Sequence, residues 1–228
     1  MPYQQSTYHS KLYCAFYEID SSDYRTQVRF FEERTERIEQ LEEEEYFELM
    51  FSYMHALFEV GMYAKYLQKV SRVLEITIEN NIGIFHGKDL FCELLFQKSA
   101  SHYQMMEYAQ AEHTARELIK INPDYTDIST LLKKILRKSY PQFNKIIQAT
   151  SVLLFIISAI VIAIEIFYLR PFYPELVSVV EMTRIVLLTS GILVYLLGEL
   201  FLVYRSERMV KQFVQEVKQK KGYHKSSI

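Results

Sequence analysis

Two long apolar runs in the C-terminal half most constrain how this chain can fold. Residues 146–164 contain no charged side chain, and residues 185–204 contain only one, Glu199. Each run approaches the roughly 20 residues that a helix needs to cross a bilayer. Because the runs flank the short stretch "RPFYP", the sequence predicts two transmembrane helices joined as a hairpin rather than two buried helices of a soluble core.

Basic residues set the expected orientation of this hairpin. Lysines and arginines precede the first run and follow the second, whereas the connecting stretch carries only Arg170 and Arg184. By the positive-inside rule, both termini lie in the cytoplasm and the "RPFYP" turn faces outward. No secretory signal is visible at the start, "MPYQQSTYHSKLYC". We therefore expect a multi-pass protein of the cell (inner) membrane.

Three ionisable side chains lie in or beside the two runs. The end of the first run and the start of the second share a depth in a hairpin, so Glu165 is expected to approach Arg184. The alternative is that Glu165 extends to water. Glu199 lies deeper, where an ionisable group is a candidate functional residue or a neutral, hydrogen-bonded structural one.

Small residues recur at heptad spacing along both runs. They allow helix backbones to approach closely, so the stripes that contain them are expected to form the contact seam of the hairpin. One stripe is Ser151, Ser158 and Glu165, and the other is Arg184, Gly191, Gly198 and Arg205.

The first 140 residues have the pattern of an all-α domain. No proline occurs between Pro2 and Pro123, which favours helices joined by short turns. Three segments place a tyrosine directly after a turn, and the tyrosines Tyr24, Tyr63 and Tyr108 recur at intervals of roughly 40 to 45 residues. Each is expected to open a helix that pairs with the helix before it, giving a solenoid-like stack of helical hairpins.

The third of these segments resembles a tetratricopeptide repeat, a helix-turn-helix unit of protein-binding solenoids. The residues that carry the resemblance are Ser99, Tyr108, Ala111, Leu118 and Pro123. The first two segments depart from the pattern, because Gln27 and Tyr66 stand where the crossing alanine belongs and neither segment ends in proline. The resemblance covers roughly residues 8 to 123 and implies a fold of stacked hairpins.

The resemblance also implies a binding groove, because the family holds a partner segment against the first helix of each hairpin. Carried over to this chain, the groove residues are Leu12, Phe16, Ile19, Glu48, Phe51, His55, Phe58, Glu93, Phe96 and Tyr103. Aromatic anchors with a few acidic groups suit a peptide or helix that bears apolar and basic residues. The alternative for each residue is ordinary packing between hairpins.

Charge is distributed unevenly, although the net charge is only -2. Glutamates dominate between Glu32 and Glu48, and basic residues dominate after Tyr204. Such local patches argue against nucleic acid as a partner.

The basic tail has two interpretations. Met209, Phe213 and Val217 recur on one face, so the tail is either an amphipathic helix on anionic lipid or a plain consequence of the positive-inside bias. The expected divisions are a cytoplasmic helical-repeat domain over 1–140, the membrane hairpin over 141–204 and the tail over 205–228.

Motifs for catalysis are missing from the sequence. It holds no Gly-rich phosphate loop, nucleophile elbow or paired metal-ligand motif, so we expect no enzyme, cofactor or metal site. Cys14 and Cys92 match no disulfide spacing and are expected to be reduced and buried.

Two hypotheses on function remain. The leading one is a membrane-anchored scaffold or adaptor that binds a cytoplasmic protein or peptide through its helical repeats. The alternative is an oligomeric membrane effector, in which the cytoplasmic domain senses a signal and the self-associated spans perturb or permeabilise the bilayer.

The orientation generates a test by cysteine labelling. Single cysteines at Ser10 and Ser226 should react with an impermeant maleimide only after the inner face is exposed, whereas one at Tyr173 should react in intact cells. Labelling of Ser10 in intact cells would contradict the cytoplasmic assignment.

Overall fold

The computed structural model describes residues 10–79, 84–85, 88–139, 141–169 and 177–225. The chain is all-α, and the only strands among these residues are the antiparallel two-residue β1 (Ile84–Phe85) and β2 (Lys88–Asp89). Internal contacts divide the chain into two compact units, residues 1–128 and 129–228.

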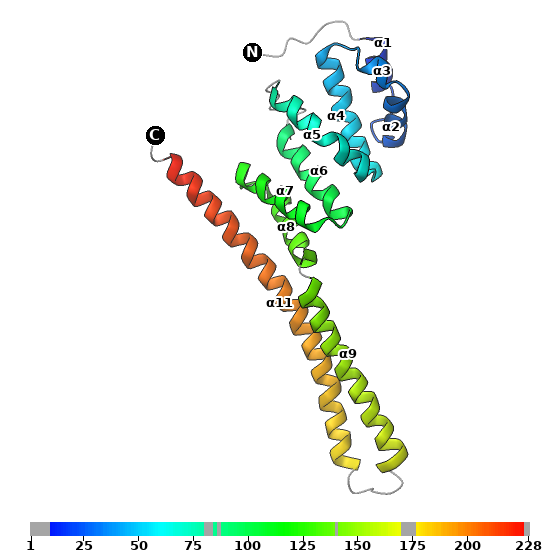
Figure 1. Cartoon of the computed structure of the whole chain (residues 1–228), viewed down its shortest axis with the longest axis vertical. Helices are drawn as coiled ribbons and strands as arrows, with labels where there is room; N and C mark the ends of the chain where they lie inside the picture. Colours follow the sequence, from blue (N-terminus) through cyan, green and yellow to red (C-terminus); the bar gives the residue numbers. More distant parts are fainter. Residues whose placement is uncertain (1–9, 80–83, 86–87, 140, 170–176, 226–228) are drawn as a thin grey trace. The chain divides into compact units, whose positions relative to one another are not determined.

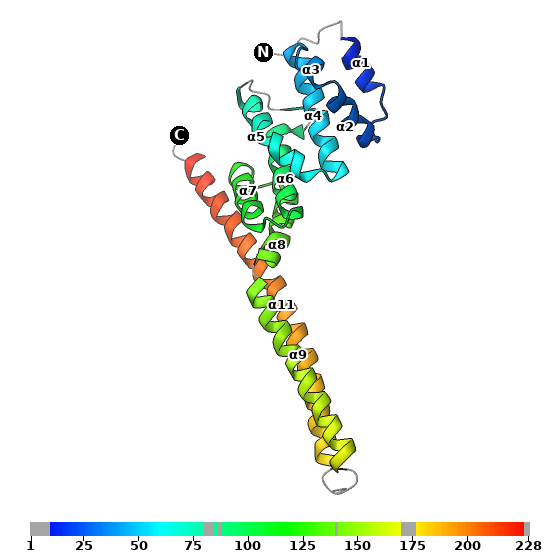
Figure 2. The same cartoon turned by 45° about the vertical axis from the view of Figure 1, so that its right-hand side comes forward.

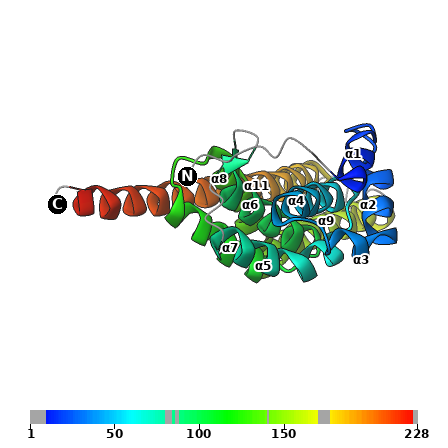
Figure 3. The same cartoon turned by 90° about the horizontal axis from the view of Figure 1, so that it is seen from above.

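The first unit is a series of helices that pack in chain order. It contains α1 (Lys11–Tyr17), α2 (Tyr24–Glu33), α3 (Thr35–Ile38), α4 (Glu43–Val60), α5 (Tyr63–Glu79), α6 (Leu90–Gln104) and α7 (Tyr108–Ile121). Helix α2 packs on α4, α4 on α5, α5 on α6 and α6 on α7 (Figures 1 and 2). Seen from above, α5 and α7 lie together beside α4 and α6 (Figure 3). As expected, the three tyrosines after turns begin α2, α5 and α7.

The turns before α5 and α7 follow the same backbone path. Gly61 lies two residues before Tyr63 with a left-handed φ of 82°, and Met106 lies two residues before Tyr108 with φ of 62°. In both turns the amide of the next residue donates to the carbonyl five residues back, at 2.9 Å. This bond closes the end of each first helix. The two hairpins therefore share one turn geometry, although only the first has the glycine that favours it.

Buried polar side chains hold the hairpins at close range. The Ser99 hydroxyl donates to the Ala111 carbonyl at 2.9 Å, and both residues are fully buried where α6 crosses α7. Tyr66, which replaces the crossing alanine in the second hairpin, is also fully buried and donates to the Leu94 carbonyl on α6 at 3.2 Å. A bulky residue at this position thus links one hairpin to the next.

The sequence predicts one long helix over 24–41, and the structure breaks it. Arg34 leaves the helical region with φ of −125° and ψ of 17°, which separates α2 from α3. The Thr35 hydroxyl donates to the Phe31 carbonyl at 3.0 Å, offering that carbonyl a side-chain donor at the break. Ile38 on α3 is fully buried. The buried apolar residues over 24–41 are therefore placed by two short helices and not by one long helix.

The two cysteines differ in exposure. Cys92 is buried, as expected, but Cys14 is exposed. Phe16 is the buried residue of the short α1, and Cys14 precedes it by two positions, on the opposite side of the helix.

The second unit is built on two long helices. Residues 129–139 complete α8 (Thr126–Ser139), and α9 (Pro141–Ile164) continues through a π-helical turn, η1 (Glu165–Leu169). Helix α9 lies side by side with α11 (Val177–Lys225) (Figures 1 and 2). Residues 145–167 and 179–222 are long and apolar enough to cross a membrane. The "RPFYP" turn lies outside the described residues.

Small residues form the seam between α9 and α11. Ser151, Ser158 and Glu165 are buried at 4%, 1% and 0% exposure, so the heptad stripe of α9 faces its neighbour. On α11, a methyl group on Gly191 would contact Leu154, and one on Gly198 would overlap Ile147. The backbone of α11 therefore approaches side chains of α9 at distances that only glycine accommodates at position 198.

Helix α11 continues past the apolar run without a break. It ends at Lys225 and is 49 residues long. Beyond the run, Ser206, Val210 and Val217 are buried, and the Arg137 side chain of α8 donates to the Ser206 hydroxyl at 3.3 Å. The expected apolar face is thus shifted, because Val210 is buried whereas Met209 and Phe213 are only half-buried.

The shared turn geometry predicts opposite effects for two reciprocal substitutions. Met106→Gly should raise stability by roughly 0.5 to 1 kcal/mol, because it removes a side chain from a left-handed residue. Gly61→Met should lower stability by about 1 to 2 kcal/mol. Thermal unfolding of the purified full chain, followed by circular dichroism, measures both. Destabilisation by both substitutions would show that the Met106 side chain contributes packing rather than strain.

Candidate functional site

The residues predicted to form a partner groove are mostly half-buried in the first unit. Phe16 is buried, and the other nine are neither fully buried nor open to solvent. Leu12 and Phe16 lie on α1, but Ile19 follows the end of that helix at Tyr17. The remaining seven come from α4 and α6, so these two helices provide most of the face.

The rings of this face also pack against the second helices. Phe58 on α4 meets the rings of Tyr63 and Tyr66 on α5 edge-on, with centroids 5.8 and 6.0 Å apart. Tyr103 on α6 packs against Tyr108 of α7 at 5.8 Å. Each ring is thus held in place by the helix that follows, while part of it stays accessible.

A chain of polar contacts connects α4 to α6 across this face. The Gln97 amide nitrogen lies 3.2 Å from Nδ1 of His55 and donates to Glu93 at 3.1 Å. The second oxygen of Glu93 accepts from the Tyr125 hydroxyl at 3.1 Å. Tyr24 of α2 meets the His55 ring edge-on. The structure therefore brings two of the predicted residues, His55 and Glu93, together through a glutamine.

The amide of Gln97 is incompletely satisfied. Gln97 is 1% exposed, and its side-chain oxygen has no hydrogen-bond partner among the described residues. A buried acceptor without a donor costs about 1 to 3 kcal/mol. One buried acceptor of this network thus has no donor among the described residues.

Tyrosine hydroxyls donate hydrogen bonds to both glutamates of the face. Tyr13 donates to Glu48, in the same way that Tyr125 donates to Glu93. Burial is the main cause that raises the pKa of each phenol well above its usual value, and the neighbouring carboxylate raises it further. Both phenols therefore stay protonated at neutral pH and orient the carboxylates as acceptors.

Gln97 and Tyr125 were not expected from the sequence. The spacing of Gln97 from Glu93, one helical turn, was the available signal for the first. Nothing local marks Tyr125, which lies 32 residues from the carboxylate it contacts. Among the described residues, no three His, Cys, Asp or Glu side chains are grouped to hold a metal ion.

An ion pair lies at the end of α9. Glu165 is fully buried and accepts from the Arg184 guanidinium at 3.1 Å, and Arg184 also lies 3.5 Å from the exposed Glu181. Glu165 is therefore turned into the seam instead of extending to water.

Glu199 has a different environment. It is half-buried on α11, and no hydrogen bond or ion pair joins it to another residue in the described segments of the chain. Of these three ionisable groups, Glu165 and Arg184 form an ion pair, and Glu199 has no partner among the described residues.

No protein-family model matches this chain, and neither a curated protein nor a solved structure is detectably similar to it. Function is therefore inferred from the geometry of the two units.

Charge reversal tests the ion pair. Arg184→Glu should destabilise the protein by about 3 kcal/mol or more, because a buried charge loses its partner. Adding Glu165→Arg should recover part of this loss, and thermal unfolding in detergent measures both steps. The matched control is Glu181→Arg, whose exposed pair should contribute no more than about 1 kcal/mol. Additive effects of the two reversals would show that the pair contributes nothing to stability.

Proposed function

We propose that the protein is a membrane-anchored adaptor that binds a cytoplasmic protein segment. Helix α9 and the apolar part of α11 anchor it in the cell membrane with both termini inside. The face formed by α4 and α6, with α1 beside α4, binds the partner.

Exposure of apolar side chains supports the membrane anchor. Only 17% and 11% of the residues in the two most apolar windows are buried, whereas the helices of a soluble core would be mostly buried. Leu153, Leu193 and Leu200 are more than half exposed. In water these surfaces would be unfavourable, and a bilayer is the solvent in which they are stable.

The observation that carries the adaptor proposal is the set of half-buried aromatic and acidic side chains on α4 and α6. Two of them, His55 and Glu93, are held by the buried Gln97 amide. Acceptors outnumber donors, so the complementary partner offers N–H donors, as lysine or arginine does, next to apolar side chains. The tetratricopeptide-like organisation of the hairpins remains part of this proposal.

A second candidate is the self-associated membrane effector. The unpartnered Glu199 in an otherwise apolar run favours it, because polar groups within spans commonly mark functional seams. The two candidates differ in what the spans do. An adaptor needs the two helices only as an anchor, whereas an effector depends on particular residues within them, such as Glu199.

The adaptor is tested by site-specific photo-crosslinking in cells. A photoreactive phenylalanine at Phe51 should form an adduct with one partner, whereas the analogue at the exposed Ile78 of α5 should not. Phe58→Ala should weaken binding by about 30-fold if the ring is an anchor residue, with helicity unchanged. Replacing residues 146–204 with an unrelated two-span hairpin should preserve the adduct.

Two outcomes would contradict the adaptor. One is equal adduct formation from Phe51 and Ile78, which would show that the face has no specific partner. The other is loss of membrane potential on expression of the native chain, abolished by Glu199→Leu and by the hairpin replacement. That second result would favour the effector.

A further inference from the structure

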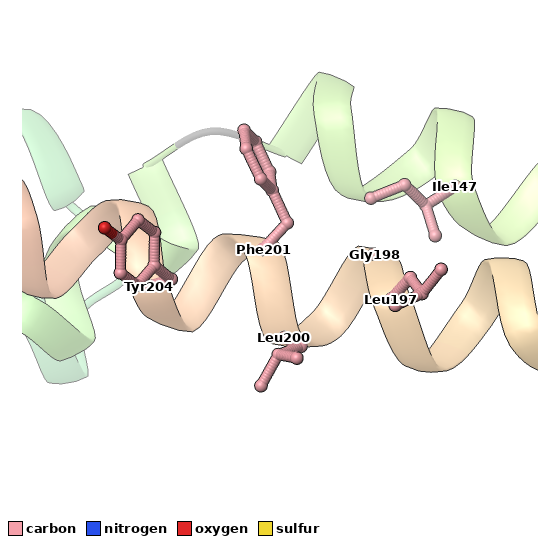
Figure 4. Close-up of a pocket in the computed structure, with 6 residues that line it drawn as sticks. All are labelled: Ile147, Leu197, Gly198, Leu200, Phe201 and Tyr204. Atoms are coloured by element: carbon pink, nitrogen blue, oxygen red, sulfur yellow. The ribbon is translucent and has the colours of Figure 1, made fainter.

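The hairpin of α9 and α11 has two flanks, and each holds a pocket. One flank holds an apolar pocket of about 660 Å³ lined by Ile147, Leu197, Gly198, Leu200, Phe201 and Tyr204 (Figure 4). Among the described residues of this lining, the hydroxyl of Tyr204 is the only side-chain heteroatom. A flank of this kind matches the hydrocarbon of a bilayer.

The other flank carries polar side chains beside a second apolar pocket. This pocket, of about 310 Å³, is lined by Gln148, Ser151, Val152, Phe155, Ile192, Tyr195 and Leu196. Glu199 follows Tyr195 by four positions and Leu196 by three, so it lies on the same face of α11, one turn further along. We call the set Gln148, Tyr195 and Glu199 the polar flank.

None of the three side chains of the polar flank is satisfied within the part of the chain that the structure describes. Gln148 and Tyr195 are exposed, Glu199 is half-buried, and no hydrogen bond or ion pair engages any of them. Hydrocarbon offers no donors or acceptors, so an unpaired amide or carboxyl facing lipid is strongly unfavourable. The polar flank therefore needs partners from outside the chain.

The register of the hairpin places a donor and an acceptor of this flank at nearly one depth. Gly198 meets Ile147, and Gly191 meets Leu154 and Phe155. Gln148 and Glu199 are the next residues after Ile147 and Gly198, and because the two helices are antiparallel they differ in depth by only about 3 Å. Gln148 supplies an amide donor and Glu199 a carboxyl acceptor, and the flank is therefore complementary to itself.

We propose that the polar flank binds a second copy of this chain, with Gln148 of each copy donating to Glu199 of the other. Both copies have the same orientation in the membrane, so their two-fold axis runs along the membrane normal. That axis places α9 of one copy opposite α11 of the other at equal depth. The result is a four-helix bundle with two equivalent polar contacts. This inference rests on the membrane placement proposed above and not on the partner face.

Disulfide cross-linking between two tagged copies tests this interface. In a background with Cys14→Ser and Cys92→Ala, one copy carries Gln148→Cys and the other carries Glu199→Cys. The new cysteines face each other across one contact, while the native Gln148–Glu199 contact remains across the other. Oxidation of isolated membranes should join most of the co-expressed copies as a heterodimer, because disulfides need Cα atoms within roughly 7 Å.

The matched control uses the apolar flank at the same depth. One copy carries Ile147→Cys and the other carries Phe201→Cys, and this pair should cross-link at least fivefold less. In a second measurement, co-purification of two tagged copies in mild detergent should persist with Glu199→Gln and with Phe201→Leu. It should fall at least tenfold with Glu199→Leu, which removes the acceptor.

Specific results would overturn the inference. Equal cross-linking on both flanks, no cross-linking on either, or adducts of the introduced polar-flank cysteines only with other proteins would each reject a second copy at the polar flank. Carbonate extraction of the same membranes distinguishes a failure of the proposed self-association from a failure of the proposed membrane anchor. A hairpin that stays in the membrane without cross-linking rejects only the self-association, and one that is extracted rejects the anchor as well.

Discussion

The ion pair between Glu165 and Arg184 sets the register of the two long helices. Glu165 is fully buried, so a shift of either helix by one residue would leave its charge without a partner inside the seam. In this register Gly191 on α11 meets Leu154 and Phe155 of α9, and Gly198 meets Ile147. The two glycines thus make room for side chains of α9, while Ser151 and Ser158 are buried in the same seam.

The π-helical turn lies directly after the seam. Helix α9 changes its winding at Glu165, the residue that forms the pair, and the change extends to Leu169. A wider turn shifts side chains around the helix axis, and such segments often occur where a particular side chain must be aimed. Regular α-helical winding thus ends at the residue that forms the ion pair with Arg184.

In the first unit, a repeated turn has the corresponding role. Gly61 and Met106 adopt the same left-handed conformation, and each sends the chain back along the preceding helix. As a result α4 and α6 present equivalent faces, and Gln97 can connect His55 to Glu93. The two turns therefore have the same backbone geometry, and the polar contacts through Gln97 join residues from two hairpins.

Sequence patterns were informative where the signal is local. The helix starts at Tyr24, Tyr63 and Tyr108 follow from turn residues and apolar periodicity, and the left-handed end at Gly61 follows from its glycine. The two apolar runs and their small-residue stripes are equally local. Heptad spacing is legible without knowledge of the neighbouring helix.

The remaining features depend on contacts that a local pattern does not contain. The break at Arg34 arises where a side chain competes with the helix, which periodicity cannot show. Met106 adopts a left-handed conformation. A glycine at that position would have made this conformation predictable, but a methionine does not. Tyr125 reaches a carboxylate on another helix, and Val210 rather than Met209 is buried because burial depends on what surrounds the tail.

The continuity of α11 has a mechanical consequence. At 1.5 Å per residue the helix is about 74 Å long, and Lys218 lies about 21 Å beyond Tyr204 along its axis. In the membrane placement proposed above, Arg205 lies near the lipid headgroups, and Lys218 lies about 20 Å further along the helix, more than two Debye lengths of about 8 Å each. The part of α11 after Tyr204 is thus a rigid, continuous extension of the apolar run. In the proposed membrane placement, torque or piston displacement of the apolar run would pass along the helix to the buried residues beyond it, Val210 and Val217.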